Sequence, residues 1–277
     1  QRPSFAKNLK GGMMSQDRFV EVGHGPTLID NNILLSDAAL RFATQGVAMV
    51  HNLICGSLTC VGEGTGWRYT PYHIPHRTEV MGFMTILHGD DRFYNNIFVQ
   101  KWPKEDVITP HDSDDGYDTE NRLAGTWTFD EYPTYEEWIS QFDFTKPVDM
   151  VKLEPVHFGH LPVWSEGNVY LGAKAWKKER NGLTAAENRE DVKVELVEKE
   201  DGYHLETNIY EFLKGFTGRM INTEVLGNAF EPEQPFENAD GTPIWFDEDY
   251  FGNHRGVATV PGPFAEAEDA EKMLYVK

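Results

Sequence analysis

Residues 31–35 read Asn-Asn-Ile-Leu-Leu, an asparagine pair directly before a short apolar run, and the first half of the chain repeats this phrase. Copies lie at residues 51–55 (HNLIC) and 95–99 (NNIFV), with shorter or looser forms at 8–9 (NL) and 167–171 (GNVYL). From residue 8 onwards, the asparagine before the apolar residue recurs after 24, 20 and 44 residues, and the last interval equals two steps of 22. A repeat in the low twenties, with strands of roughly three to five residues, is typical of a parallel β-solenoid.

Stacking of successive coils explains this repeat. Each coil adds short parallel strands, and equivalent positions of neighbouring coils lie roughly 4.8 Å apart. Asparagine suits the corner before a strand, because it tolerates a left-handed backbone and its amide bonds neighbouring backbone groups. The inward positions must be apolar, and we expect them to be Ile33, Leu35, Leu53, Ile97 and Val99. The alternative is a β-sandwich in which asparagine-rich turns recur by coincidence.

Two insertions interrupt the predicted coils, one at residues 56–80 and one at residues 101–147. Within the second, Thr134 and Glu137 have the spacing of a capping box, which predicts a helix over residues 132–142. Insertions of this length are usually functional or flexible.

The pattern changes near residue 190, where apolar residues begin to alternate on both sides of an Asp-Gly turn. Such alternation predicts an antiparallel hairpin. We therefore expect an all-β chain, with parallel coils over residues 1–190 and an antiparallel extension packed on them over residues 191–277.

The composition excludes several classes of function. The chain has 277 residues, with 45 acidic against 25 basic side chains, a formal net charge of −20 and no basic patch, so a nucleic-acid partner is not expected. No apolar run approaches the length of a membrane span, so a membrane partner is not expected either. The two cysteines, Cys55 and Cys60, cannot form a disulfide framework. Association of the chain with copies of itself stays open.

Residues 19–26 (FVEVGHGP) are the densest candidate for chemistry. In a strand, Val20 and Val22 point to one face and Glu21 to the other. A carboxyl group flanked by apolar neighbours is expected to hold its proton more tightly, as a general acid requires. The glycines on either side of His24 let the backbone pass close to whatever His24 faces. The alternative is that Glu21 faces solvent from an outer surface.

A second cluster, at residues 68–79, combines aromatic, imidazole, guanidinium and carboxyl side chains. Sugar binding needs this combination, because apolar ring faces stack on the sugar and polar groups bond its hydroxyls. The candidate substrate contacts are Tyr72, His73, His76 and Glu79, together with His24 of the preceding cluster. The two histidines could also bind zinc, with Glu79 or Asp90 as an oxygen ligand, but their spacing is not helical and we expect no metal and no cofactor.

A third cluster, at residues 88–94 (HGDDRFY), directly precedes a predicted strand. We expect Asp90 and Arg92 to reach the same surface as the general-acid candidate and to bind substrate there. The alternative is a salt-bridged turn, in which Asp91 pairs with Arg92 or Arg77. Carboxylate chemistry is favoured, because there is no Gly-x-Ser-x-Gly elbow and neither cysteine has an activating neighbour.

Three of these stretches, at residues 21–36, 70–79 and 89–99, resemble glycoside hydrolase family 120, a family of β-xylosidases, and residues 229–241 resemble it as well. The resemblance covers most of the chain. It implies a right-handed parallel β-helix, in agreement with the coil spacing. It also implies a retaining mechanism in which two carboxylates release xylose from xylo-oligosaccharides, and Glu21 matches the family's general acid/base.

The resemblance places the nucleophile, an aspartate, about one coil before Glu21, just ahead of Gln1. Stacking by roughly 4.8 Å fits the separation of about 5–5.5 Å that retaining glycosidases need. One coil after Glu21 lie residues 43–45 (ATQ), without a carboxylate. Since Gln1 is not a start methionine, we expect a fragment that is weak or inactive alone. No signal peptide is visible in the first residues, which favours the cytoplasm.

Three other functions are compatible with the same residues. A different β-helix glycosidase, such as a fucosidase, would act on another sugar. A polysaccharide lyase would need a Lys or Arg base and calcium, for which the acidic run at residues 112–120 is a candidate. A non-catalytic carbohydrate-binding solenoid would be indifferent to Glu21→Gln, a change that destroys turnover by a glycosidase.

Overall fold

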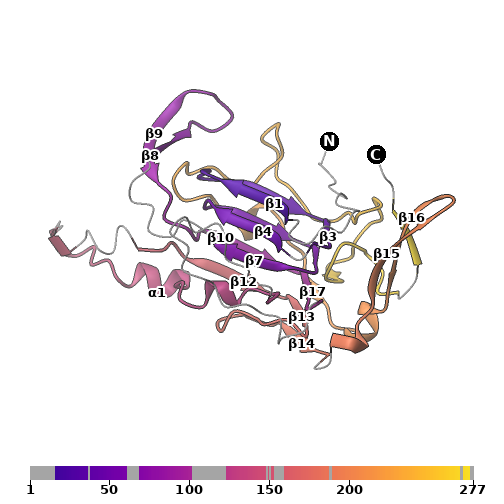
Figure 1. Ribbon diagram of the computed structural model, residues 1–277. Coiled ribbons are helices and arrows are strands. Elements are labelled where there is room, and N and C mark those ends of the chain that lie inside the picture. Colours follow the sequence, from indigo (N-terminus) through magenta and orange to yellow (C-terminus); the bar gives the residue numbers. More distant parts are fainter. Residues whose placement is uncertain are drawn as a thin grey trace.

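The computed structural model describes residues 16–36, 38–60, 69–101, 123–147, 149, 151–152, 159–186, 189–268 and 271–274. Within them, three parallel sheets are built from short stacked strands (Figure 1). The first sheet contains β1 (Gln16–Glu21), β4 (Ala38–Ala43) and β7 (Ser57–Cys60). The second contains β2 (Thr27–Asp30), β5 (Val47–Val50), β10 (Asp91–Tyr94) and β12 (Val163–Glu166). The third contains β3 (Ile33–Leu34), β6 (Leu53–Ile54), β11 (Ile97–Val99), β13 (Val169–Leu171) and β14 (Leu183–Ala185).

The chain passes through the three sheets in turn and then repeats the circuit one strand further along the stack. β1, β2 and β3 are followed by β4, β5 and β6, and each strand pairs in parallel with its counterpart. Gln16 pairs with Ala38, 22 residues later, and Ile33 pairs with Leu53, 20 residues later. The predicted all-β chain with stacked parallel strands is therefore confirmed.

The 44-residue interval from Asn52 to Asn96 holds one coil and not two. β6 pairs directly with β11, so the predicted division into two steps of 22 is wrong. The additional residues include an antiparallel hairpin of β8 (Tyr69–His73) and β9 (Val80–Thr85), which projects beyond the sheets in Figure 1. The predicted insertion at residues 56–80 is also misplaced, because β7 belongs to the first sheet and the projecting hairpin continues through β9.

Four buried asparagines form a hydrogen-bonded ladder at the corner between the second and third sheets. Asn32 donates its backbone N–H and its Nδ2–H to Oδ1 of Asn52, at 2.9 and 3.2 Å, and Asn52 donates in the same way to Asn96, at 3.0 and 2.8 Å. Asn96 donates to Oδ1 of Asn168, at 2.9 and 3.0 Å. Each side-chain amide also donates to a backbone carbonyl. The ladder therefore satisfies polar groups that a buried corner would otherwise leave unpaired.

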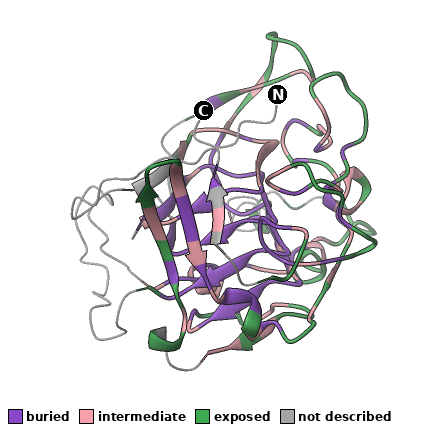
Figure 2. Ribbon diagram, turned by 90° about the vertical axis from the view of Figure 1, so that its right-hand side faces the viewer, coloured by how far each residue is buried: buried purple, intermediate pink, exposed green. Residues whose placement is uncertain are grey.

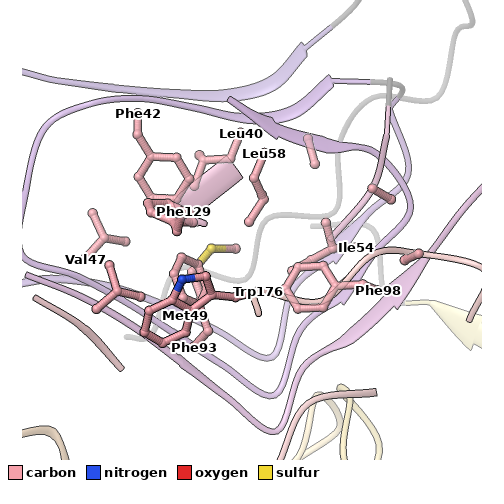
Figure 3. Packing of buried hydrophobic residues seen from close by; sticks show 14 of the residues in the cluster. Leu40, Phe42, Val47, Met49, Ile54, Leu58, Phe93, Phe98, Phe129 and Trp176 are labelled. Carbon is pink, nitrogen blue, oxygen red and sulfur yellow. The ribbon is translucent and has the colours of Figure 1, made fainter. Parts of the chain in front are cut away.

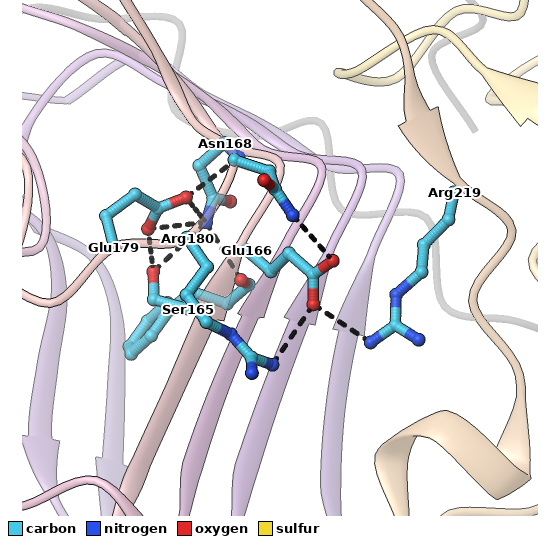
Figure 4. A network of polar contacts seen from close by, with 8 residues as sticks. Ser165, Glu166, Asn168, Glu179, Arg180 and Arg219 are labelled. Atoms are coloured by element: carbon cyan, nitrogen blue, oxygen red, sulfur yellow. Dashed lines mark hydrogen bonds and ion pairs between the residues drawn. The ribbon is translucent and has the colours of Figure 1, made fainter.

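Glu179 ends this ladder (Figure 4). Its carboxylate accepts from the backbone N and the Nδ2 of Asn168, both at 3.1 Å, from the Ser165 hydroxyl, and from Tyr170 Oη at 2.9 Å. Burial raises the pKa of Glu179, and these donors oppose the shift. Gly182 stands at the corner position before β14, and a Cβ there would lie 2.7 Å from Glu179 Cγ. The glutamate side chain thus fills the space that a further asparagine would need.

Apolar side chains fill the space that the three sheets enclose (Figure 3). This cluster includes Leu40, Phe42, Val47, Met49, Ile54, Leu58, Phe93, Phe98, Phe129, Tyr170 and Trp176. The residues predicted to point inward pack in a different cluster, on the outer face of the third sheet; they are Ile33, Leu35, Leu53, Ile97 and Val99. Both faces of that sheet are buried, so an apolar run does not reveal which residues face the interior.

The C-terminal third covers the outer faces of two sheets, and buried residues therefore continue from the strands into it (Figure 2). β15 (Val194–Lys199), β16 (Gly202–Thr207) and β19 (Glu271–Leu274) form an antiparallel sheet, which confirms the predicted hairpin. Leu205 and Phe264 pack with the outer residues of the third sheet. Apolar residues between 221 and 246 pack on the outer face of the second sheet.

The helices of the described residues are short. They are α1 (Tyr135–Ile139) and α3 (Thr223–Leu226), with 3-10 turns η2 (Trp127–Phe129), η3 (Arg189–Asp191) and η4 (Ile209–Phe212); β17 (Gly218–Arg219) pairs with β18 (Ala258–Thr259). The predicted capping box of Thr134 and Glu137 is present, although α1 is shorter than expected. No helix in this part of the chain is both long and apolar enough to cross a membrane. The acidic run at residues 112–120 lies outside the described residues.

Replacing Asn96 tests the ladder. In Asn96→Ala, Asn52 loses its acceptor and Asn168 its donor, and an unsatisfied buried polar group costs about 1–3 kcal/mol. We expect the free energy of unfolding to fall by about 3 kcal/mol, measured by chemical denaturation. Asn253→Ala, at an exposed position whose φ angle is not positive, is the matched control. Equal losses in the two variants would contradict a stabilising ladder.

Candidate functional site

The candidate site begins at the corner between β1 and β2, where successive coils pack backbone against backbone. Gly25 and Gly46 have positive φ angles of 76° and 72°. A Cβ on Gly25 would lie 2.5 Å from the Gly46 carbonyl oxygen, and one on Gly46 would lie 2.8 Å from the His24 carbonyl oxygen. These glycines therefore allow neighbouring corners to stack, rather than clearing space for a group that the His24 side chain faces.

His24 joins this corner to the projecting hairpin. Its side chain is buried, and Nε2 lies 2.7 Å from Thr70 Oγ1 on β8. The ring also packs edge-on against Tyr72, with 5.6 Å between the ring centroids. Burial lowers the pKa of His24, so the neutral imidazole is favoured at neutral pH. Nδ1 has no hydrogen-bond partner among the described residues.

A cavity of about 530 Å³ opens between the corner and the hairpin. The corner, β8 and the loop at residues 232–234 line it; the lining residues are Val22, Gly23, His24, Gly25, Pro26, Thr27, Tyr69, Thr70, Pro71, Tyr72, His73, Pro232 and Gln234. The structure thus brings together three predicted substrate contacts, His24, Tyr72 and His73. We call this space the first cavity.

Glu21 directly precedes Val22, the first of these lining residues. It is the last residue of β1 and pairs with Ala43 of β4. Its side chain is exposed, so the expected enclosure by apolar neighbours is not found. Flanking valines in the sequence did not bury it, because Glu21 points away from the apolar face of the strand.

His76 and Glu79 lie farther out on the hairpin. His76 Nε2 is 2.6 Å from Glu237 Oε1, so this histidine ties the hairpin tip to the loop that supplies Pro232 and Gln234. Glu79 is exposed and is not among the residues that line the first cavity. No three His, Cys, Asp or Glu side chains gather as a metal site requires in the residues that the structure describes.

Asp90 and Arg92 line a second cavity, of about 330 Å³, instead of the first. Arg92 is buried, and its guanidinium donates to the carbonyls of Leu226 and Asn228 and to Asp90 Oδ1, each at 2.7 Å. Asp90 Oδ2 accepts from the Phe230 backbone N at 2.7 Å. Burial raises the pKa of Asp90, and Arg92 opposes the shift. The two residues therefore hold the segment at 226–230 against the coils.

A salt bridge expected as the alternative in this turn is present, but its carboxylate comes from Asp90 and not from Asp91. Arg92 pairs with Asp90, whereas Asp91 accepts a hydrogen bond from the Val47 backbone N at 3.0 Å. Asp91 is fully enclosed, and burial raises its pKa well above the usual range of a carboxyl group.

Several lining residues were not predicted. Thr70 orients His24, and Pro232 and Gln234 close the first cavity from a segment more than 200 residues from the corner. Trp138 and Trp164 line the second cavity. The only sequence signal for the segment that contains Pro232 and Gln234 is the resemblance of residues 229–241 to glycoside hydrolase family 120. No local pattern indicates where a loop packs.

The comparisons with known proteins add one solved structure. No family model matches the sequence, and no curated protein matches it. Among solved structures, the chain is similar to the complex structure of XylC with xylose, with 31% sequence identity and a TM-score of 0.74. The similarity covers 92% of this chain and 36% of the XylC chain, so this chain spans little more than a third of its neighbour's length.

The buried imidazole of His24 makes a testable contribution to stability. Because its pKa is lower in the folded than in the unfolded state, the unfolded state binds more protons below about pH 6.5. This contribution is therefore full above about pH 6.5 and is lost as the pH falls below it. We expect His24→Gln to lose less stability than the parent chain between about pH 7 and pH 5, in denaturation curves at each pH. If His24→Gln and the parent chain lost the same stability over this pH range, the contribution would not come from His24.

Proposed function

We propose that this chain carries the acid/base side of a retaining β-xylosidase active site of the type found in glycoside hydrolase family 120. The first cavity carries the proposal, because an aromatic ring and two imidazoles line it and the exposed carboxylate of Glu21 directly precedes its first lining residue. The similarity to XylC, a protein solved with xylose, supports a xylose-containing ligand. The substrate would be a xylo-oligosaccharide.

The architecture fits this proposal. Strands β1 and β4 are parallel neighbours joined by a crossover through two other sheets, and such connections are right-handed in nearly all proteins. The coils would then form a right-handed parallel β-helix over residues 1–190. Residues 191–277 would form the extension that covers two of its faces.

Glu21 would serve as the general acid/base. It would protonate the oxygen of the leaving sugar and later remove a proton from the attacking water. Once Glu21 has given up its proton it is the carboxylate base that the second step needs, and the proton it takes from water returns it to its acid form. His24, Tyr72 and His73 would line the sugar site, with the Tyr72 ring against the apolar face of the sugar.

The nucleophile would stand on the opposite edge of β1 from β4. Retaining glycosidases need two carboxyl groups about 5–5.5 Å apart, close to the spacing of roughly 4.8 Å between adjacent strands. On the β4 side the residue beside Glu21 is Ala43, which has no carboxyl group. An aspartate on a strand paired with the other edge of β1 would have the required spacing.

A second candidate function is sugar binding without hydrolysis. It is favoured by one observation: no Asp or Glu is among the described residues that line the first cavity. In that case Glu21 would be a solvent-facing residue and the cavity a binding site only.

Replacement of Glu21 separates the two functions. In the natural protein that carries these residues, we expect Glu21→Gln to lower kcat/KM for xylobiose by at least about 100-fold, since general acid–base catalysis contributes about 10²–10⁴. The loss should be smaller for nitrophenyl xyloside, whose leaving group needs little protonation. Added azide should restore turnover of this activated substrate by Glu21→Gly, because azide attacks without a general base.

Glu200→Gln, at an exposed turn position, is the matched control. Binding of xylose, measured by calorimetry, should persist in Glu21→Gln. If Glu21→Gln and Glu200→Gln hydrolyse xylobiose equally well, Glu21 is not the acid/base.

A further inference from the structure

We propose that the second cavity binds a further sugar unit of the oligosaccharide that occupies the first cavity. This inference rests on the proposed function and adds a substrate contact to it. The second cavity has a volume of about 330 Å³ and lies between α1, β12 and the segment at residues 225–230. Its lining residues include Asp90, Arg92, Tyr135, Trp138, Trp164 and Phe230.

The two cavities lie along the same corner of the coil stack. The Gly46 backbone N donates to the Gly89 carbonyl at 3.2 Å, and the Asp90 backbone N donates to the Pro162 carbonyl at 2.7 Å. The first cavity lies at the Gly25 corner, and Asp90 lies two corners further along. With strands about 4.8 Å apart, this separation is roughly 10 Å along the stack, a distance that a short oligosaccharide can span.

The walls of the second cavity are aromatic. Tyr135 of α1 stacks beside Trp164 of β12, with 6.2 Å between the ring centroids and 24° between the planes. Phe230 meets Trp138 edge-on, at 5.3 Å. Tyr135 and Phe230 are 44% and 45% exposed, so large ring surfaces remain open to a ligand. Aromatic faces of this kind suit the apolar face of a sugar ring. They suit a cationic ligand less well, because the Arg92 guanidinium already lies 4.5 Å from the centre of the Trp164 ring.

Asp90 supplies the polar group that fixes orientation. It is 1% exposed; Oδ1 accepts a hydrogen bond from Arg92, and Oδ2 accepts one from the Phe230 backbone N. A carboxylate has about four acceptor sites, so a sugar hydroxyl can still donate to it. The same carboxylate reaches towards the neighbouring corner, since Oδ2 would lie 3.2 Å from a Cβ on Gly46.

One loop forms part of both cavities. The Ala229 backbone N donates to the Gln234 carbonyl at 2.8 Å and closes this loop. Phe230 lines the second cavity, whereas Pro232 and Gln234 line the first. Glu231 lies between them, and burial together with the charge of Asp90 raises its pKa. A ligand that spans both cavities would therefore contact both sides of one loop.

Fluorine NMR of the chain labelled with fluorotryptophan tests the proposal. Trp138 and Trp164 line the second cavity, and no tryptophan among the described residues lines the first, so the signals of these two residues report on the second cavity. Trp138→Phe and Trp164→Phe assign the two signals. We expect xylotriose to shift both signals and xylose to bind with much smaller shifts.

Tyr135→Ala should weaken xylotriose binding at least tenfold in calorimetry and leave the affinity for xylose unchanged. Phe144→Ala is the control, because Phe144 is 78% exposed, follows the same helix and does not line the cavity. Tyr135 is preferred to Trp138, which packs on Leu87 and Leu161 and whose loss would disturb the core.

The outcomes distinguish this inference from the proposed function. If xylotriose binds and Tyr72→Ala abolishes that binding, but neither tryptophan signal moves and Tyr135→Ala binds normally, the second sugar contact is wrong and the first cavity stands. If neither xylose nor xylotriose binds the chain, the proposed function and this inference both fail. If maltotriose shifted the two tryptophan signals as much as xylotriose does, the second cavity would not be specific for xylose-containing oligosaccharides and the inference would be wrong.

Discussion

The hydrogen bonds from one asparagine to the next are the constraint on which the rest of the structure depends. A corner buried between two sheets and the C-terminal cover has little access to water, so its backbone groups must find partners inside the protein. Asn52 and Asn96 provide them, because each accepts from the coil before and donates to the coil after. This pairing sets the register of the coils, and a slip of one residue would exchange the inner and outer side chains of every strand.

That register positions both cavities. It places the Gly25, Gly46 and Gly89 corners in one column, where the absence of side chains lets each coil approach the next. The hairpin of β8 and β9 leaves the column between two coils and returns to it, and His24 anchors its base through Thr70. The C-terminal segment then completes both spaces, held by the buried guanidinium of Arg92.

The coil stack could be predicted from the sequence, because asparagine at each corner has a local chemical reason. The face of the sheet on which Ile33 and Leu53 lie could not be predicted, because a strand buried on both faces has no polar side to mark its orientation. The grouping of His24 with Tyr72 was predictable in part, as both lie in segments unusually rich in chemical groups. The place of Arg92 was not, because its partners lie more than 130 residues away in a segment whose packing no local pattern specifies.

Glu179 decides where the ladder stops. An asparagine side chain both accepts and donates, so a line of asparagines has no inherent last member and could continue into any further coil that offered an acceptor. A carboxylate only accepts, and it occupies the space beside Gly182 that a further asparagine would fill. The stack therefore has a chemical direction, and the acceptor-only carboxylate of Glu179 is its terminus at one end.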